Sequence, residues 1–221
     1  MKKLILTILT LVPFVTKAQV TLIPDAVFEN YLLHWGYDSD GLINGQILTS
    51  DALTVNELDF INKSPNNISW VDLDGFNDFT NLEILKVEND ATNISFSNLS
   101  NLKNIYLDNC DLTSFDATPL EELELQCSSA DVPSRKIREL DFSNSPNFNY
   151  LLVRELRNLE RISLRNNQAS AVSIILHAGS DYNICIEVDN PLDATNKLPP
   201  YDNWSITWDG VHDYIYFYFS D

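Results

Sequence analysis

The fold is decided by the stretch LERISLRNN, Leu159 to Asn167, which has leucine or isoleucine at its first, fourth and sixth positions and asparagine at its ninth. The same template occurs in LEILKVEND from Leu82, LKNIYLDNC from Leu102 and LEELELQCS from Leu120. IRELDFSNS, from Ile137, repeats it with Ile and Phe substituted. The fourth positions of the template are Leu58, Leu85, Ile105, Leu123, Leu140, Ile162 and, more loosely, Ile186.

The spacing of these positions is typical of leucine-rich repeats, whose period is about 20–29 residues. The L-x-L core of each repeat predicts a short strand with its leucines inward, and successive strands are expected to stack in parallel. Apolar pairs between these strands are expected as extended segments on the convex side: Ile94/Phe96, Leu112/Phe115, Leu151/Val153 and Val172/Ile174. We therefore predict a mostly β solenoid with one parallel concave sheet of about seven strands over residues 55–190.

Residues 1–18 have the pattern of a secretory signal peptide. Two lysines precede the apolar run Leu4 to Val15, and Ala18 supplies a small residue before the expected cleavage at Gln19. A membrane anchor is the alternative, but a run this short, interrupted by Pro13, does not span a bilayer. No cysteine follows for a lipid anchor. The sequence predicts a secreted, periplasmic or cell-surface protein with no integral membrane segment.

Both ends of the repeat array are expected to be capped. Residues 19–54 form the predicted amino-terminal cap, with a short helix that Asp25 begins and Gly36 ends. Residues 191–221 form the predicted carboxy-terminal cap, in which the aromatic run Tyr214 to Phe219 is expected as a closing strand. The alternative for this run is an adhesive edge through which copies of a structural envelope protein self-associate.

Composition limits the function. With 14 basic against 32 acidic residues and a net charge of −18, the chain is unsuited to nucleic acid. None of the common catalytic motifs is present, so no enzymatic activity and no cofactor are predicted. The three cysteines are an odd number, and buried free thiols are favoured over a Cys110–Cys127 disulfide because the two lie out of register in their repeats.

One segment imitates part of a calcium-binding loop. Asp38-Ser-Asp-Gly-Leu-Ile-Asn44 has the glycine and the hydrophobic anchor of an EF-hand. In that register, however, Gly36 and Ile47 stand where the first and the bidentate twelfth ligand belong. An Asx-rich turn is therefore the favoured interpretation, and no metal site is predicted.

Four stretches carry a family resemblance. Ile23 to Glu29 and Gly36 to Asp51 resemble the amino-terminal cap of secreted leucine-rich repeat proteins from Bacteroidetes, and Cys185 to Asn190 with Asn203-Trp204 resembles their closing segment. The middle repeats are similar to the internalin class. The resemblance implies protein–protein or cell-surface interaction, with no catalytic residues to transfer.

The expected binding face carries the residues that flank the strand leucines on the outward side. Four acidic ones, Glu122, Glu124, Glu139 and Asp141, are expected on adjacent strands. The later arginines either offset these acids within the chain, which is the favoured interpretation, or help to orient a partner. The negative charge is compatible with a basic partner, although charge alone favours a role in solubility. The candidate partner-binding residues are Lys86, Tyr106, Asp108, Glu122, Glu124, Glu139, Asp141, Arg161 and Arg165.

Overall fold

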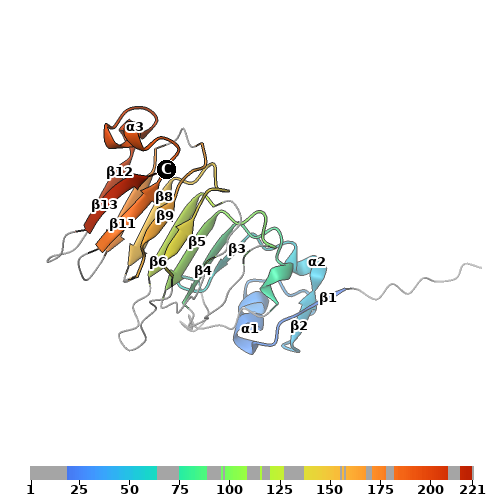
Figure 1. Ribbon diagram of the computed structural model, residues 1–221. Helices are drawn as coiled ribbons and strands as arrows, with labels where there is room; N and C mark the ends of the chain where they lie inside the picture. Colours follow the sequence, from blue (N-terminus) through green and yellow to red (C-terminus); the bar gives the residue numbers. More distant parts are fainter. Residues whose placement is uncertain are drawn as a thin grey trace, which may run out of the picture.

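The computed structural model describes residues 19–63, 75–88, 96, 98–108, 115, 120–126, 137–154, 156, 158–167, 171–177, 182–208 and 215–220. The predicted signal peptide and the Cys110–Cys127 pair lie outside these ranges. Two parallel sheets and a small amino-terminal cap make up most of the described chain (Figure 1).

The amino-terminal cap is built around a short helix. It comprises β1 (Val20–Leu22), α1 (Ala26–His34), β2 (Gln46–Leu48) and α2 (Thr49–Ala52), with β1 and β2 antiparallel. The Asp25 carboxylate accepts hydrogen bonds from the backbone N–H groups of Val27 and Phe28 at 2.6 and 3.3 Å. Gly36 follows the helix with a φ of 74°. The predicted helix with its Asp25 cap is therefore confirmed.

Seven strands form the larger sheet, all of them parallel. They are β3 (Glu57–Asp59), β4 (Ile84–Glu88), β5 (Asn104–Asp108), β6 (Glu122–Gln126), β8 (Tyr150–Arg154), β10 (Ser173–His177) and β12 (Ser205–Trp208). The short 3-10 turn η2 (Phe76–Asp78) precedes β4. In β4 and β5, buried and half-buried residues alternate, so that each strand has one face in the core and one face outward.

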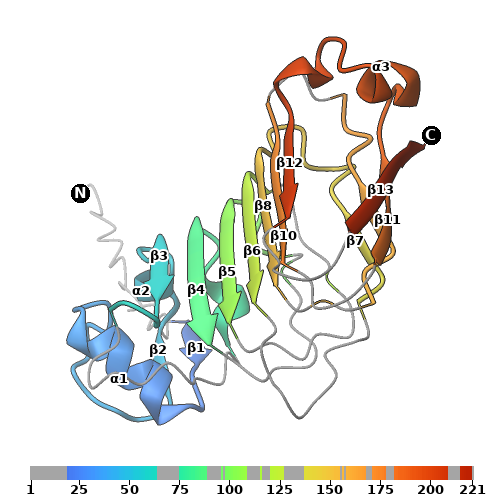
Figure 2. The same cartoon turned by 90° about the vertical axis from the view of Figure 1, so that its left-hand side faces the viewer.

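A second parallel sheet begins after β6. Its strands, in spatial order, are β13 (Ile215–Ser220), β11 (Tyr182–Glu187), β9 (Arg161–Ser163) and β7 (Glu139–Asp141). From β6 onward the chain alternates between the two sheets, one strand in each, and Figure 2 shows them as separate layers. Between β11 and β12 lie α3 (Pro191–Thr195) and the 3-10 turn η3 (Tyr201–Asn203).

The prediction of parallel strands at the seven marked positions is confirmed, but the prediction of a single concave sheet is wrong. Leu140, Ile162 and Ile186 lie in the four-stranded sheet. The next strand beside Leu123 in the seven-stranded sheet contains Leu151, which the sequence placed on the convex side. The segment from Leu123 to Leu140 takes the chain across to the opposite sheet.

One hydrophobic core runs from the cap to the last repeat. Phe142 and Phe148 stack in it with ring centroids 3.8 Å apart. Ser145, the ninth residue of its repeat, is buried, and its hydroxyl accepts a hydrogen bond from the backbone N–H of Leu120 at 3.0 Å. Asn166 donates from its side chain to the backbone carbonyl of Ser145 at 2.8 Å. The Ser145 hydroxyl and the Asn166 amide thus satisfy backbone groups that would otherwise be unpaired.

Candidate binding face

Strand register places two rows of side chains on the outer face of the seven-stranded sheet. The Glu122 row is Ile84, Asn104, Glu122, Tyr150 and Ser173. The Glu124 row is Lys86, Tyr106, Glu124, Leu152 and Ile175. A hollow of about 430 Å³ lies over β4, β5 and β6, and its lining includes Lys86, Tyr106 and both glutamates. Because neighbouring parallel strands are about 4.8 Å apart, these side chains form a continuous patch.

Glu124 has the most unusual environment in this patch. Burial raises the pKa of its carboxyl, and the nearby Glu122 acts in the same direction. The positive charges of Arg154 and Lys86, and a hydrogen bond with the Tyr150 hydroxyl, oppose this rise without cancelling it. The ionised form of Glu124 is therefore short of favourable contacts, which is the condition in which a carboxylate gains most from an additional cation.

The tyrosines on either side share this half-buried environment. Burial raises the pKa of Tyr106, and the charges of Asp108 and Glu124 add to the effect. Burial, followed by the charge of Glu124, likewise raises the pKa of Tyr150. Both phenols therefore remain neutral hydrogen-bonding groups at physiological pH, each with an apolar ring beside the acidic residues.

Other polar groups in the patch already have partners. Asn104 donates from its side-chain nitrogen to Glu122 Oε2 at 2.7 Å. Lys86 Nζ lies 3.3 Å from Asp59 Oδ2, and the Asp59 side chain is only 2% exposed. Although burial opposes ionisation of Asp59, hydrogen bonds from Asn62 and the Lys86 ammonium together hold its pKa below the usual value. Lys86 thus neutralises a buried carboxylate in addition to bordering the hollow.

The structure divides the nine sequence-predicted residues between the two sheets. Lys86, Tyr106, Asp108, Glu122 and Glu124 lie on β4, β5 and β6, whereas Glu139, Asp141 and Arg161 lie on β7 and β9 and Arg165 follows β9. The predicted cluster of four adjacent carboxylates is therefore wrong, because β6 pairs with β8 and β7 pairs with β9.

On the second sheet the charges are paired within the chain. Arg161 lies between two glutamates, with its guanidinium nitrogens 2.5 Å from Glu139 Oε2 and 3.0 Å from Glu187 Oε1. Hydrogen bonds to these two carboxylates raise the pKa of Arg161. Arg138 forms a further ion pair with Glu160 at 2.8 Å. For Arg138 and Arg161, the structure supports the interpretation that the later arginines offset acidic residues within the chain.

Sequence reasoning missed one half of the binding face. Tyr150, Leu152 and Ile175 continue the two rows, but the template assigned their strands to the convex side. The signal was present: Leu151-x-Val153 and Ile174-x-Leu176 have the same inward spacing as Leu123-x-Leu125.

The acidic loop of the cap forms an Asx-rich turn, as the sequence favoured. Asp38 and Asp40 accept from the backbone N–H groups of Asp40 and Leu42 at 3.3 and 2.8 Å. Glu29, which is buried, accepts from the backbone N–H groups of Asn44, Gly45 and Gln46 at 2.8 to 3.1 Å. In the part of the chain that the structure describes, no group of three or more His, Cys, Asp or Glu side chains is arranged to hold a metal ion.

No protein-family model and no curated protein matches the chain. Two internalins are among the solved structures similar to it. One is an internalin C2 from Listeria monocytogenes, with a TM-score of 0.42 and 13% identity over 89% of this chain and 100% of that one. The other is a further internalin from Listeria monocytogenes, with a TM-score of 0.36 and 15% identity over 88% and 71%. The fold assignment rests on the strand register, independently of these similarities.

No helix among the described residues is long and apolar enough to cross a membrane.

Proposed function

We propose that this chain is a secreted, non-enzymatic binding protein that holds a protein or cell-surface partner against the outer face of the seven-stranded sheet. The observation that carries the proposal is the half-buried Glu124 carboxyl, which lines a hollow together with Tyr106 and is hydrogen-bonded with Tyr150 on the neighbouring strand. A face built on paired strands loses little conformational freedom when a partner docks.

The chemistry of the hollow favours a partner that brings a cation with an apolar stem. An arginine or lysine side chain placed beside Glu122 and Glu124 would compensate the desolvated carboxylate. Its methylene groups would meanwhile pack on the tyrosine rings. Tyrosines in such positions are typical anchors of protein interfaces. The negative net charge of the chain would speed the approach of a basic partner.

The proposed location outside the cytoplasm rests on the amino-terminal sequence. Its two lysines, apolar run and small residue before Gln19 have the order of an export signal. The expected mature chain begins at Gln19.

The experiment compares two charge-reversed forms of the mature chain as baits on the native cell surface. In one, Glu122→Lys and Glu124→Lys reverse the outer face of the seven-stranded sheet. In the matched control, Glu139→Lys and Asp141→Lys make the same change in net charge on the other sheet. Both forms are first checked for an unchanged circular dichroism spectrum and melting temperature.

We expect the Glu122/Glu124 form to lose the partner that the unmodified chain captures, with affinity at least tenfold weaker, equivalent to about 1.4 kcal/mol. The control form is expected to retain it. The proposed face would be wrong if the unmodified chain and both charge-reversed forms captured the partner equally. It would also be wrong if only the Glu139/Asp141 control form lost the partner.

A further inference from the structure

Lys86 lies between two carboxylates on the outer face of the seven-stranded sheet. Strand register forms one row from Asp59, Lys86, Tyr106 and Glu124, on β3, β4, β5 and β6 in that order. Asp59 is one strand from Lys86, and Glu124 is two strands away on the other side, a backbone separation of about 10 Å. Because lysine has a flexible four-carbon stem, its ammonium can turn toward either carboxylate.

The ammonium is held at the first of these carboxylates. Lys86 Nζ lies 3.3 Å from Asp59 Oδ2, and among the described residues this is the salt bridge that Lys86 forms. Asn62 donates to the same carboxylate, from its backbone N–H to Oδ1 at 2.8 Å and from its side chain to Oδ2 at 3.1 Å. Since the Asp59 side chain is only 2% exposed, moving the ammonium away would leave a buried charge without its counterion. Lys86 is therefore anchored toward β3.

Glu124 is left with weaker compensation. It is faced by Lys86 from β4, by Glu122 on its own strand, and by Tyr150 and Arg154 from β8. Burial is the largest cause of the raised pKa of its carboxyl, and the charges of Arg154 and Lys86 oppose the rise without cancelling it. If the Lys86 ammonium turned to Glu124, it would pair with this carboxylate inside the hollow that both residues line.

We infer that Asp59 is a positioning residue for the binding face: by anchoring Lys86 at β3, it leaves the Glu124 carboxylate to a cation of the partner. The part of this inference that concerns the partner rests on the proposed function. Arg161 on the other sheet has the opposite arrangement, because it forms ion pairs with carboxylates of both neighbouring strands. There the resident cation neutralises the face, whereas Asp59 diverts Lys86 from doing so.

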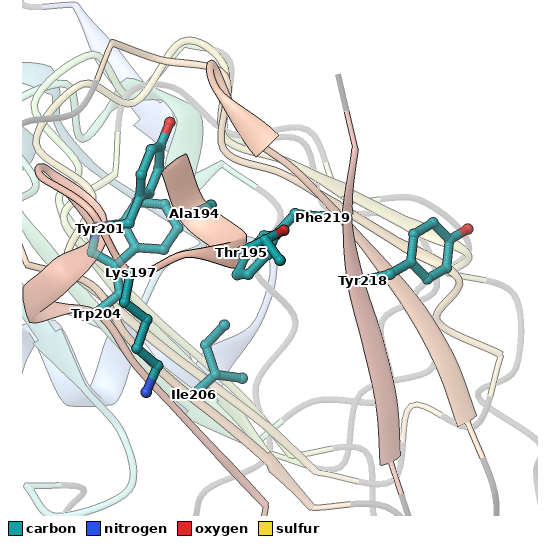
Figure 3. Close-up of a pocket in the computed structure, with 8 residues that line it drawn as sticks. All are labelled: Ala194, Thr195, Lys197, Tyr201, Trp204, Ile206, Tyr218 and Phe219. Atoms are coloured by element: carbon teal, nitrogen blue, oxygen red, sulfur yellow. The ribbon is translucent and has the colours of Figure 1, made fainter. Parts of the chain in front are cut away.

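A second hollow of the chain supplies a matched control. It has a volume of about 460 Å³ and is lined by residues of α3, β12 and β13, and the charged residue in its described lining is Lys197 (Figure 3). Lys197 follows α3 and lies outside the row from Asp59 to Glu124. Lys197→Met therefore makes the same change in net charge as Lys86→Met without altering that row.

Titration of the Glu124 carboxyl by nuclear magnetic resonance tests the inference on the mature chain. Asp59→Asn removes the buried anion but keeps an oxygen that can accept from the Asn62 backbone. We expect Lys86 to turn toward Glu124 and lower the pKa of its carboxyl. Adding Lys86→Met should return this pKa to the parent value or above it, whereas adding Lys197→Met should leave it lowered. Circular dichroism and the melting temperature check that each variant is folded.

Binding of N-acetylarginine amide, followed at the same Glu124 resonance, supplies a second readout. Its half-saturating concentration is expected to rise at least tenfold in Asp59→Asn and to return to the parent value in Asp59→Asn/Lys86→Met. A Glu124 pKa that Asp59→Asn leaves unchanged, or that stays lowered after Lys86→Met is added, would overturn the inference. Failure of the unmodified chain to bind this probe counts against the proposed function alone, because the titration still decides the role of Asp59.

The unmodified chain allows a further test that does not depend on a folded variant. The Lys86 ammonium and the Asn62 side-chain amide both contact Asp59 Oδ2, so nuclear Overhauser contacts between the Lys86 ε-methylene and this amide are expected. Contacts of the same methylene with the Glu124 γ-methylene in their place would overturn the inference.

Discussion

Gly75 is a residue that the fold cannot replace. Its φ is 92°, and a Cβ atom built on it would lie 1.9 Å from the backbone carbonyl oxygen of Leu22 and 3.2 Å from the Ile23 side chain. The turn that leads into η2 therefore touches the backbone of the amino-terminal cap. Both the left-handed conformation and the close approach require glycine.

We expect Gly75→Ala to lower the free energy of unfolding by at least about 3 kcal/mol, since the backbones must separate and alanine must adopt a strained φ. Gly41→Ala is the control, because Gly41 has a φ of 75° with no atom within 4 Å of the added Cβ. It is expected to cost only about 1 kcal/mol. Urea denaturation measures the free energy of unfolding of both variants. Equal decreases would show that the close approach of Gly75 to Leu22 does not contribute to the cost of the substitution.

Glu124 links the proposed binding site to stability. Burial raises the pKa of its carboxyl in the folded chain, so the folded state holds this proton more tightly than the unfolded state does. The corresponding contribution to stability is complete below the unfolded pKa of about 4.3 and is lost as the pH rises through the folded pKa. At pH 7 the ionised carboxylate therefore costs stability, and we expect Glu124→Gln to unfold at higher urea concentration there.

The free energy of unfolding of Glu124→Gln is expected to exceed that of the parent only slightly near pH 4, where the carboxyl is largely protonated. The variant is also expected to bind the partner more weakly. Urea denaturation at the two pH values checks this. Tyr150→Phe is a useful companion: it removes the hydroxyl that hydrogen-bonds Glu124 and so should raise the pKa of that carboxyl further. A Glu124→Gln variant less stable than the parent at pH 7 would contradict the assignment.

Among the elements, β3 is the strand whose backbone is hydrogen-bonded by a tyrosine of the amino-terminal cap. The Tyr31 hydroxyl accepts from the backbone N–H of Asp59 in a buried setting, and burial raises the pKa of Tyr31 to about 12. We expect Tyr31→Phe to cost about 1–3 kcal/mol, because it leaves a buried N–H without its acceptor. The exchange rate of the Asp59 amide should rise in hydrogen-exchange measurements, whereas Tyr37→Phe in the same cap should leave it unchanged.

At the level of elements, the sequence predicted strands well and their sheet poorly. Each marked position, from Leu58 to Ile186, lies in a strand, because inward apolar residues at alternate positions determine local structure. Which sheet receives a strand does not follow from this spacing, because Ile105 and Leu123 lie in the same sheet whereas Leu123 and Leu140, separated by nearly the same number of residues, lie in different sheets. The segment from Leu123 to Leu140 makes half a turn of the solenoid, and the longer segment from Leu123 to Leu151 completes one.

The candidate site was accordingly predicted in part. Glu122 and Glu124 were placed on the correct face because β4, β5 and β6 follow one another in the sheet. Tyr150, Leu152 and Ile175 were missed because they lie beyond the point at which the chain begins to alternate between sheets. The pairing of Arg161 with both Glu139 and Glu187 depends on that alternation and was not visible from spacing alone.

At the scale of the whole molecule, the two sheets differ in how their charges are satisfied. On the four-stranded sheet, Arg161 joins carboxylates of β7 and β11. On the seven-stranded sheet, the Glu124 carboxyl remains poorly compensated beside an open hollow. This difference supports the proposal that a partner binds the outer face of the seven-stranded sheet.

The most direct test of the account is the hydrogen-exchange footprint of the partner captured from the native cell surface. We predict slower exchange in residues 84–88, 104–108, 122–126 and 150–154 when the partner is bound, with β7, β9 and β11 unaffected. Protection confined to β7, β9 and β11, with the outer face of the seven-stranded sheet unchanged, would contradict the account.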